Sequence, residues 1–142
     1  MPHIKHRLVV NTSPKAVFEN LTSIKGLAGW WSPDTTGKTD VDEVLKFGFG
    51  PDYSKEIKVV SVEPDKRVQW KCLKATDEWV GTTIEFDLQK DQDKTVVMFS
   101  HSSWRAYTPM FGQCSYDWAM FLKSLKLLCE KGMGNPFPDQ YQ

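Results

Sequence analysis

Apolar and polar positions alternate near the N-terminus of the chain. Ile4, Leu8 and Val10 fall on one side of an extended segment, and Lys5 falls on the other. A repeat of two residues is typical of a strand with one buried face. We therefore predict a strand over residues 4–10.

Two short helices are predicted after this strand. Residues 11–14 read Asn-Thr-Ser-Pro, which places a hydroxyl side chain at the N-cap and a proline in the first helical turn. Val17 and Leu21 then share one helical face. A second short helix is predicted over residues 24–31, and it ends at a pair of tryptophans.

Five more segments have strand patterns and are separated by turns. They span residues 43–49, 56–62, 68–72, 79–88 and 95–101. Consecutive strands with short turns favour an antiparallel meander. The helical patterns lie at the two ends of the chain and not between these strands, which favours an α+β fold over a doubly wound parallel sheet. We expect a sheet of about six strands, with polar residues 34–42 as a surface loop.

The last long pattern is helical. From about residue 111 to residue 131, the apolar side chains fall on one broad face of a helical wheel. They are Phe111, Cys114, Trp118, Phe121, Leu122, Leu125, Leu128 and Cys129. Gly132 and Gly134 then end the helix. We expect residues 133–142 to form a loosely held tail.

A single helix with so broad an apolar face needs a sheet that curls around it. The expected architecture is therefore a helix-grip fold, in which a curved antiparallel sheet surrounds the long C-terminal helix and the two short helices close one end. Residues 1–142 are expected to form one domain, because this length suits a single core. A cavity between sheet and helix is a common place for a small apolar ligand.

Charge and cysteine content exclude several classes of partner. The 18 basic side chains equal the 18 acidic ones, so neither nucleic acid nor an anionic membrane surface is an expected partner. No apolar run reaches the roughly 18–20 residues of a membrane span, and the N-terminus lacks the apolar region of a signal peptide. We therefore expect a cytoplasmic protein whose three cysteines are reduced.

Neither a metal site nor a cofactor is predicted. His3 and His6 have no neighbouring cluster of cysteine or carboxylate side chains, which a zinc site would need. The sequence has no phosphate-binding loop and no dinucleotide-binding fingerprint. The remaining candidate is a site that binds an apolar ligand by burying it.

Aromatic residues are the unusual feature of the composition, with six Trp, eight Phe and four Tyr. They either fill a bulky core or leave an aromatic-lined cavity. The candidate ligand-binding residues are Trp30, Trp31, Trp70, Phe86, Phe99, His101, Trp104, Phe111, Trp118 and Phe121. Of these, Trp30, Trp31, Trp104 and Phe111 lie near predicted loops, so they are the better candidates for a pocket mouth or lid.

His101 is the one weak candidate for a catalytic residue. It ends a predicted strand, and at a pocket mouth it could orient a carbonyl group or act as a general base. The alternative is a structural histidine that is hydrogen-bonded at a strand end. Asp117 could meet His101 or Arg105 across the cleft, or could be a solvated carboxylate near the start of the helix.

Five stretches of the chain resemble a known family. They are SPKAVF at residues 13–18, WW at 30–31, VSVEPDKRVQW at 60–70, TVVMFSH at 95–101 ahead of Trp104, and CSYDW at 114–118. With the order of elements, they make the chain similar to the START-like (SRPBCC, birch-pollen-allergen-like) superfamily. Within it, the chain resembles the group related to the activator of heat-shock protein 90 ATPase.

This resemblance implies a hydrophobic cavity. It also implies ligand binding or transport, as in many members, cyclisation or hydrolysis, as in a few, or stimulation of a chaperone ATPase, as in the founding members. Three hypotheses therefore stay open. The first, which we favour, is a binding protein for a small apolar or aromatic molecule. The second is an interaction module for a chaperone ATPase, and the third is a cyclase or hydrolase with His101 as its base.

Overall fold

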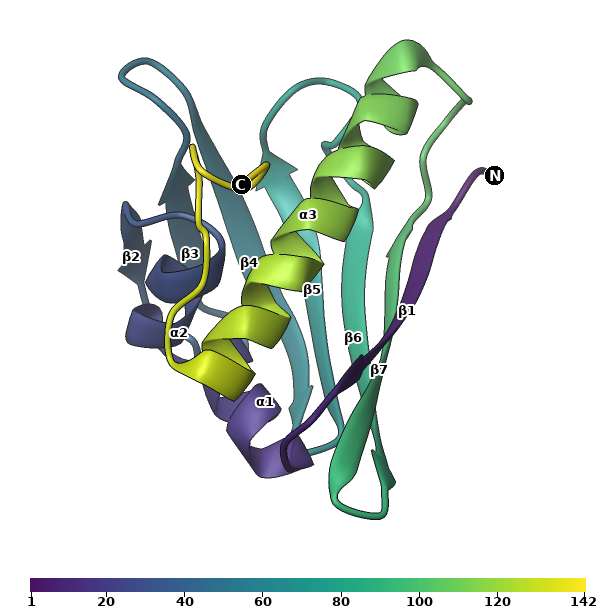
Figure 1. The fold of residues 1–142 in the computed structure, drawn as a ribbon. Coiled ribbons are helices and arrows are strands. Elements are labelled where there is room, and N and C mark those ends of the chain that lie inside the picture. The colour runs from purple at the N-terminus through teal and green to yellow at the C-terminus, as the bar shows by residue number, and fades with distance from the viewer.

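The computed structural model describes residues 1–142, which form seven strands and three helices (Figure 1). In chain order the elements are β1 (Ile4–Val10), α1 (Pro14–Leu21), α2 (Ile24–Trp30), β2 (Thr35–Gly37), β3 (Val44–Gly48), β4 (Ser54–Glu63), β5 (Arg67–Lys74), β6 (Thr83–Asp91), β7 (Lys94–Ser102) and α3 (Pro109–Lys131). The predicted α+β helix-grip architecture is confirmed: the sheet curves around α3, and α1 and α2 lie at one end (Figure 1).

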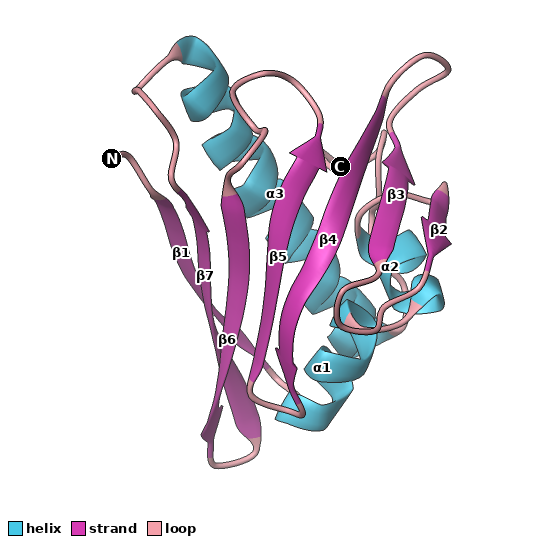
Figure 2. Ribbon diagram, turned by 180° about the vertical axis from the view of Figure 1, so that it is seen from behind, coloured by secondary structure: helices cyan, strands magenta, loops and turns pink.

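All strands belong to one antiparallel sheet in the order β1-β7-β6-β5-β4-β3-β2. Strands β3 to β7 form the expected meander, and β1 joins its far edge, where Ile4 pairs with His101. Seen from behind in Figure 2, the sheet lies in front of α3 and bends toward it along both edges. The first strand and the last are therefore neighbours, although almost the whole meander separates them in the chain.

The sheet has one more strand than expected, because residues 35–37 of the predicted loop pair with β3. Thr35 lies opposite Phe47, and Gly37 lies opposite Leu45. Gly37 adopts a φ of 111°, and a Cβ there would meet the backbone oxygen of Val44 at 2.4 Å. A short polar strand of this kind satisfies the backbone groups of β3 and leaves a poor edge for further pairing.

The strand predicted from residue 79 begins only at Thr83. The backbone N–H of Trp79 donates to the oxygen of Thr76 in a turn, and Gly81 follows with a φ of 86°. The alternating pattern did not reveal this turn, because a tryptophan with an inward-facing side chain fits either conformation. The result is a connection between β5 and β6 that carries Trp79 under the first turns of α3.

Hydroxyl side chains cap the starts of α1, as predicted, and of α3, where no cap was predicted. The Ser13 hydroxyl accepts the backbone N–H of Ala16 at 3.3 Å. Thr108 does the same for Phe111 at 3.1 Å, so α3 begins at Pro109, slightly earlier than expected. Satisfying free N–H groups in this way stabilises a helix start by about 1 kcal/mol.

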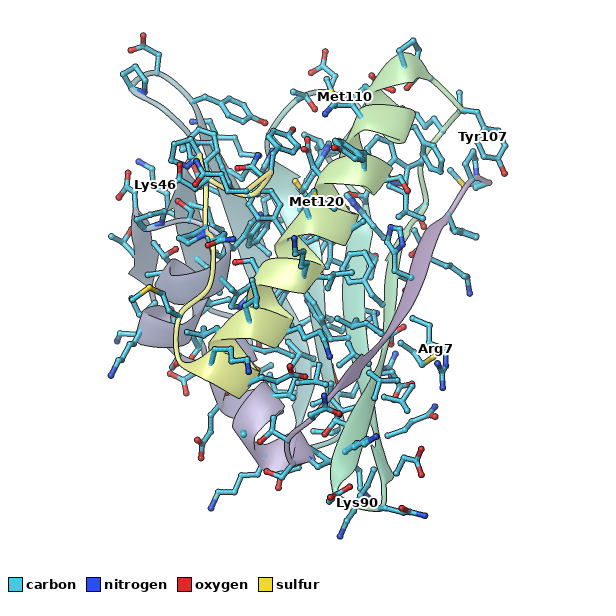
Figure 3. All side chains as sticks on the ribbon, viewed as in Figure 1. Arg7, Lys46, Lys90, Tyr107, Met110 and Met120 are labelled. Carbon is cyan, nitrogen blue, oxygen red and sulfur yellow. The ribbon has the colours of Figure 1, made fainter.

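The broad apolar face of α3 lies in the hollow of the sheet. Its buried residues are Cys114, Trp118, Phe121, Leu122, Ser124 and Leu125. The outer face of the sheet carries mostly polar side chains, and exposed ones such as Arg7 and Lys46 point away from the core (Figure 3). None of the helices combines the length and the apolar character needed to cross a membrane.

The chain after α3 differs from the expected loose tail. The backbone N–H of Asn135 donates to the Ser124 hydroxyl at 2.7 Å, and that of Phe137 donates to the oxygen of Trp31 at 2.8 Å. The Phe137 ring meets Phe49 edge-on at 5.3 Å. The glycines and prolines of the tail end the helix, but they do not prevent this packing, which draws the chain back along α2 and β3 (Figure 1).

Candidate functional site

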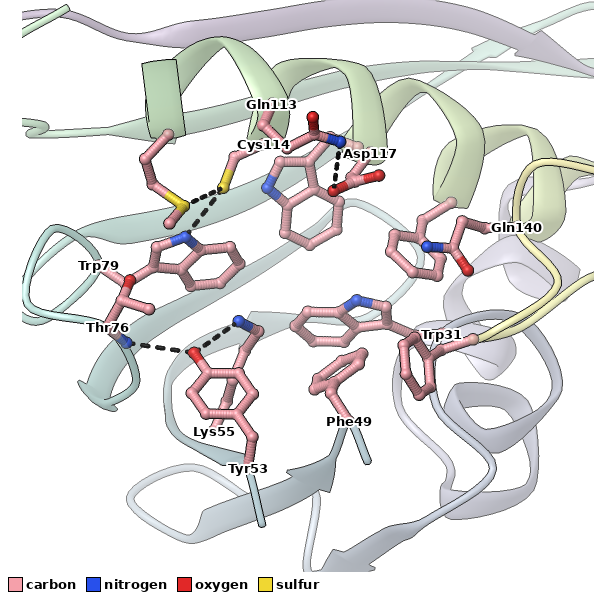
Figure 4. Close-up of a pocket in the computed structure, with 14 residues that line it drawn as sticks. Trp31, Phe49, Tyr53, Lys55, Thr76, Trp79, Gln113, Cys114, Asp117 and Gln140 are labelled. Carbon is pink, nitrogen blue, oxygen red and sulfur yellow. Dashed lines mark hydrogen bonds between the residues drawn. The ribbon is translucent and has the colours of Figure 1, made fainter. Parts of the chain in front are cut away.

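A pocket of about 240 Å³ lies between the first half of α3, the connections at one end of the sheet and the C-terminal tail. Its apolar wall comprises Trp31, Phe49, Trp79, Trp118, Phe121 and Phe137. Its polar lining comprises Tyr53, Lys55, Thr76, Gln113, Asp117 and Gln140. These side chains come from the residue after α2, from β4, from the β3–β4 and β5–β6 connections, from α3 and from the tail, so the pocket exists only in the folded chain (Figure 4).

Three tryptophans dominate the apolar wall. Trp31 follows α2, and its ring lies 5.0 Å from that of Trp118. The ring of Trp118 in turn lies 6.1 Å from that of Trp79 at an angle of 23°. On its far side Trp31 stacks parallel to Trp70, with centroids 5.9 Å apart. The wall is thus held from behind by core aromatics and presents flat apolar faces to the pocket.

His101 holds two of these walls in place. It is fully buried, and its Nδ1 accepts the indole N–H of Trp118 at 3.0 Å. Because Nδ1 is the acceptor, the proton of the neutral ring lies on Nε2, which donates to the Thr82 hydroxyl at 2.7 Å. That hydroxyl then donates to the backbone oxygen of Trp79 at 2.5 Å. Burial, with the charge of Lys55 adding to it, lowers the pKa of His101 to about 3.

The structure therefore corrects the expected position of His101 at the pocket mouth. The alternation of β7 turns this side chain into the core, and Trp79 and Trp104 cover it with ring centroids 4.5 and 4.8 Å away. Asp117 does not meet His101 or Arg105. Its carboxylate accepts the Tyr141 hydroxyl and the Gln113 amide, because the tail returns to this side of α3.

Lys55 is the cation of the pocket. It lies opposite the inward-facing Phe47 on the neighbouring strand, so its partly buried side chain lies on the pocket side of the sheet. The ammonium nitrogen lies 3.9 Å from the Trp79 ring centroid, 4.8 Å from that of Tyr53 and 5.1 Å from that of Phe49. Four salt bridges form in the molecule, and Lys55 takes part in none.

Two buried polar atoms of the pocket residues lack partners. The backbone N–H of Thr76 donates to the Tyr53 hydroxyl at 3.1 Å, but the Thr76 hydroxyl is buried without a hydrogen bond. The side-chain oxygen of Gln140 is also buried without a partner, and this residue is only 7% exposed. Buried polar groups are nearly always satisfied in native proteins, so such a pair in one pocket is informative.

Cys114 lines the same pocket as a reduced thiol. Its sulfur accepts the indole N–H of Trp79 at 3.2 Å, and burial raises its pKa. A neutral thiol of this kind is a packing group and not a nucleophile. The three cysteines are all free, and no three His, Cys, Asp or Glu side chains gather as a metal ion would require.

The ten candidate ligand-binding residues divide into two groups. Trp31, Trp118 and Phe121 line the pocket. The other seven, Trp30, Trp70, Phe86, Phe99, His101, Trp104 and Phe111, lie outside its lining. Trp30 and Trp104, which had been expected near the mouth, are fully buried, because Trp30 bonds to the backbone of Asn20 and the N-terminal segment covers Trp104 through Pro2.

Sequence reasoning missed most of the polar lining. For Lys55 a signal existed, since it lies two and four positions before the apolar Ile57 and Val59 of the same strand. Residues at this spacing point to the same face of a strand. Tyr53 and Thr76 lie in connections where no periodicity applies, and Gln140 lies in the supposedly loose tail. Their convergence on one pocket is a result of tertiary structure alone.

Comparison with known proteins places this architecture in a family. The family model described as "Activator of Hsp90 ATPase homolog 1-like protein" matches residues 11–130. The solution structure of the Aha1 dimer from Colwellia psychrerythraea is similar, with 36% identity, a TM-score of 0.87 and coverage of 94% of this chain and 100% of that one. A search of curated proteins found no match.

More distant structures share the fold alone. A crystal structure from Staphylococcus saprophyticus has 16% identity and a TM-score of 0.75, over 94% of this chain and 95% of that one. That of CalU16 from Micromonospora echinospora has 16% identity and a TM-score of 0.77, over 98% and 79%. The fold, the family model and the 36% identical relative agree. The chain therefore belongs to the family of activator of Hsp90 ATPase homolog 1-like proteins, within the START-like superfamily.

Proposed function

We propose that this protein binds a small aromatic molecule in the pocket between α3 and the sheet. The observation that carries the proposal is an open space of about 240 Å³ with an aromatic wall and unpartnered polar groups. Protein interiors are normally close-packed, so a core that only stabilised the fold would leave no space of this size. Apolar walls with a few polar groups are typical of ligand sites.

The size of the pocket limits the ligand. Sites for drug-sized molecules span roughly 300–1,000 Å³, and this one lies just below that range. A molecule of one to three fused rings fits better than a long lipid chain. Flat faces of Trp31, Trp79 and Trp118 favour planar rings, since each aromatic pair contributes about 0.5–1.5 kcal/mol beyond burial.

The structure favours ligand binding over a catalytic role in which His101 acts as the general base. Both ring nitrogens of His101 are hydrogen-bonded to protein groups, and the ring does not line the pocket. With a pKa of about 3 it is also a poor proton acceptor near neutral pH. His101 therefore acts on the ligand through the position of Trp118 and Trp79.

A thermal-shift screen with indole, quinoline and 2-naphthol tests the proposal. A ligand that binds only the folded chain raises its melting temperature. Gln113 lines the pocket from an exposed position on α3, so Gln113→Trp should reduce the shift by obstructing the mouth. Lys123→Trp is the matched control, because Lys123 is exposed on the same helix away from the pocket. The proposal fails if none of the three compounds shifts the wild-type protein.

Contact with a chaperone ATPase is a second proposed function. It is favoured by the family description and by the full-length match to the Aha1 dimer. Tyr107 and Met110 are exposed around the start of α3 (Figure 3), and Tyr116 is exposed nearly two turns further on. Measuring the ATPase rate of an Hsp90-type chaperone with and without this protein tests the idea. An unchanged rate together with no detectable complex removes it.

A further inference from the structure

One end of the pocket has hydrogen-bond donors and no acceptor left to receive them. The Tyr53 oxygen accepts two hydrogen bonds, from the Lys55 ammonium and from the backbone N–H of Thr76, both at 3.1 Å. Both of its lone pairs are then used, so the phenolic proton is free to donate. The Thr76 hydroxyl is a further donor without a partner.

The charge at this end is also unmatched. The Lys55 ammonium has three protons, of which one is directed to Tyr53 and the others lie among the aromatic rings. It takes part in no salt bridge with a carboxylate. A partly buried cation without a counter-ion is unfavourable. An anionic group that bound here would therefore gain a charge-assisted hydrogen bond as well as two neutral ones.

The opposite end of the pocket has the reverse character. The Asp117 carboxylate of α3 lies at this end, near the Gln140 side chain of the tail (Figure 4). Asp117 already accepts from Gln113 and Tyr141. This carboxylate repels an anion, and its remaining lone pairs favour a hydrogen-bond donor. Aromatic side chains, among them Trp31, lie between the two ends (Figure 4).

We infer that the ligand is a small aromatic acid, with its acid group against Lys55, Tyr53 and Thr76 and a hydroxyl or N–H donor at its far end against the Asp117 carboxylate. This inference rests on the proposed function, and it adds the ligand class and the direction in which the ligand lies. A carboxylate suits the site best, since its two oxygens accept several hydrogen bonds at once.

Isothermal titration calorimetry with three related compounds tests the inference on the unmodified protein. They are 2-naphthoate, its neutral isostere 2-naphthamide, and 6-hydroxy-2-naphthoate. The acid should bind about tenfold more tightly than the amide, because one charge-assisted hydrogen bond is at stake. The hydroxy acid should bind about threefold more tightly than 2-naphthoate through a hydrogen bond from its hydroxyl to the Asp117 carboxylate.

Variants assign the preference to particular side chains. Lys55→Met should abolish the advantage of the acid over the amide, whereas Lys46→Met, on the exposed face of β3, should keep it. Tyr53→Phe and Thr76→Val each remove one donor without changing the charge, and each should weaken binding of the acid severalfold. They also serve if Lys55→Met does not fold, which a thermal melt would reveal.

The outcomes separate this inference from the function on which it rests. Equal affinity for 2-naphthoate and 2-naphthamide overturns the inference and leaves binding of aromatic molecules intact. An acid preference that survives in folded Lys55→Met overturns it as well, because the anion then lies elsewhere. If none of the three compounds binds, the proposed function itself fails.

Discussion

The indole N–H of Trp118 on α3 donates to Nδ1 of His101 on β7, with 3.0 Å between the nitrogens. This bond connects the long helix to the floor of the sheet inside a fully buried region. The same imidazole continues through the Thr82 hydroxyl to the backbone of Trp79. Two walls of the pocket are therefore held by one neutral histidine, which fixes both their separation and their tilt.

Replacing His101 by Leu should destabilise the fold by about 2–3 kcal/mol. The change leaves the Trp118 N–H without an acceptor in the core, and a buried donor without a partner costs roughly 1–3 kcal/mol. The Thr82 hydroxyl keeps its bond to the oxygen of Trp79 but loses the one it accepts from His101. Urea denaturation monitored by tryptophan fluorescence measures the effect. His3→Leu is the control, since His3 is exposed and bonds only to the backbone of Ser103. A difference under about 0.5 kcal/mol between the two variants would show that the buried network is dispensable.

Stability should fall in mild acid because His101 resists protonation in the folded state. Its pKa is about 3 in the fold against an ordinary value of 6.5. Between these values the unfolded chain binds a proton that the folded chain does not. The free energy of unfolding therefore decreases as the pH falls, by about 1.4 kcal/mol per pH unit at most. Above pH 6.5 this contribution is complete and no longer varies.

Urea titrations at pH 7, 6 and 5 test this expectation. Carboxylates begin to titrate at lower pH, so the comparison is made with His101→Gln, which cannot gain a proton. The wild-type protein should lose more stability between pH 6 and pH 5 than this variant does. Parallel pH profiles for the two proteins would mean that the imidazole is protonated in the folded state.

The tail should be held as firmly as the core next to it. Phe137 is half-buried, so Phe137→Ala should cost about 2 kcal/mol, less than the roughly 3–5 kcal/mol of a fully buried phenylalanine. Met133→Ala should have almost no effect, since Met133 is 77% exposed. Hydrogen exchange gives a second readout, because the backbone N–H of Phe137 is bonded to Trp31. Rapid exchange at this amide would show that the tail is loosely held, as the sequence suggested.

Two glycines should respond in opposite ways to alanine. A Cβ at Gly134 would lie 2.6 Å from the oxygen of Gly29 and 2.8 Å from that of Ser124, so the tail must move away from α2. Gly134→Ala should destabilise by about 1–3 kcal/mol. Gly112 is exposed in α3 with open space around it, and Gly112→Ala should stabilise by about 0.5–1 kcal/mol. Thermal melts of both variants distinguish these signs, and equal shifts would contradict the close approach at Gly134.

The elements themselves followed from local patterns in the chain. The alternation of Ile4, Leu8 and Val10 predicted β1, and the hydroxyl before Pro14 predicted the start of α1. The broad apolar face of α3 required a curved sheet, and the family resemblance agrees with it. These features are encoded locally because side-chain period and capping depend on residues only a few positions apart.

The pocket was decided by tertiary structure. Trp30 and Trp31 are neighbours with the same side chain, yet only Trp31 lines the pocket, because the Trp30 indole bonds to Asn20 beneath α2. Lys55, Thr76 and Gln140 meet although long stretches of chain separate them. No periodicity connects such positions, since their distances depend on how the whole sheet curves and how the tail packs. The sequence alone determined which segments would be strands and helices, and the packing of those segments decided which side chains a ligand could meet.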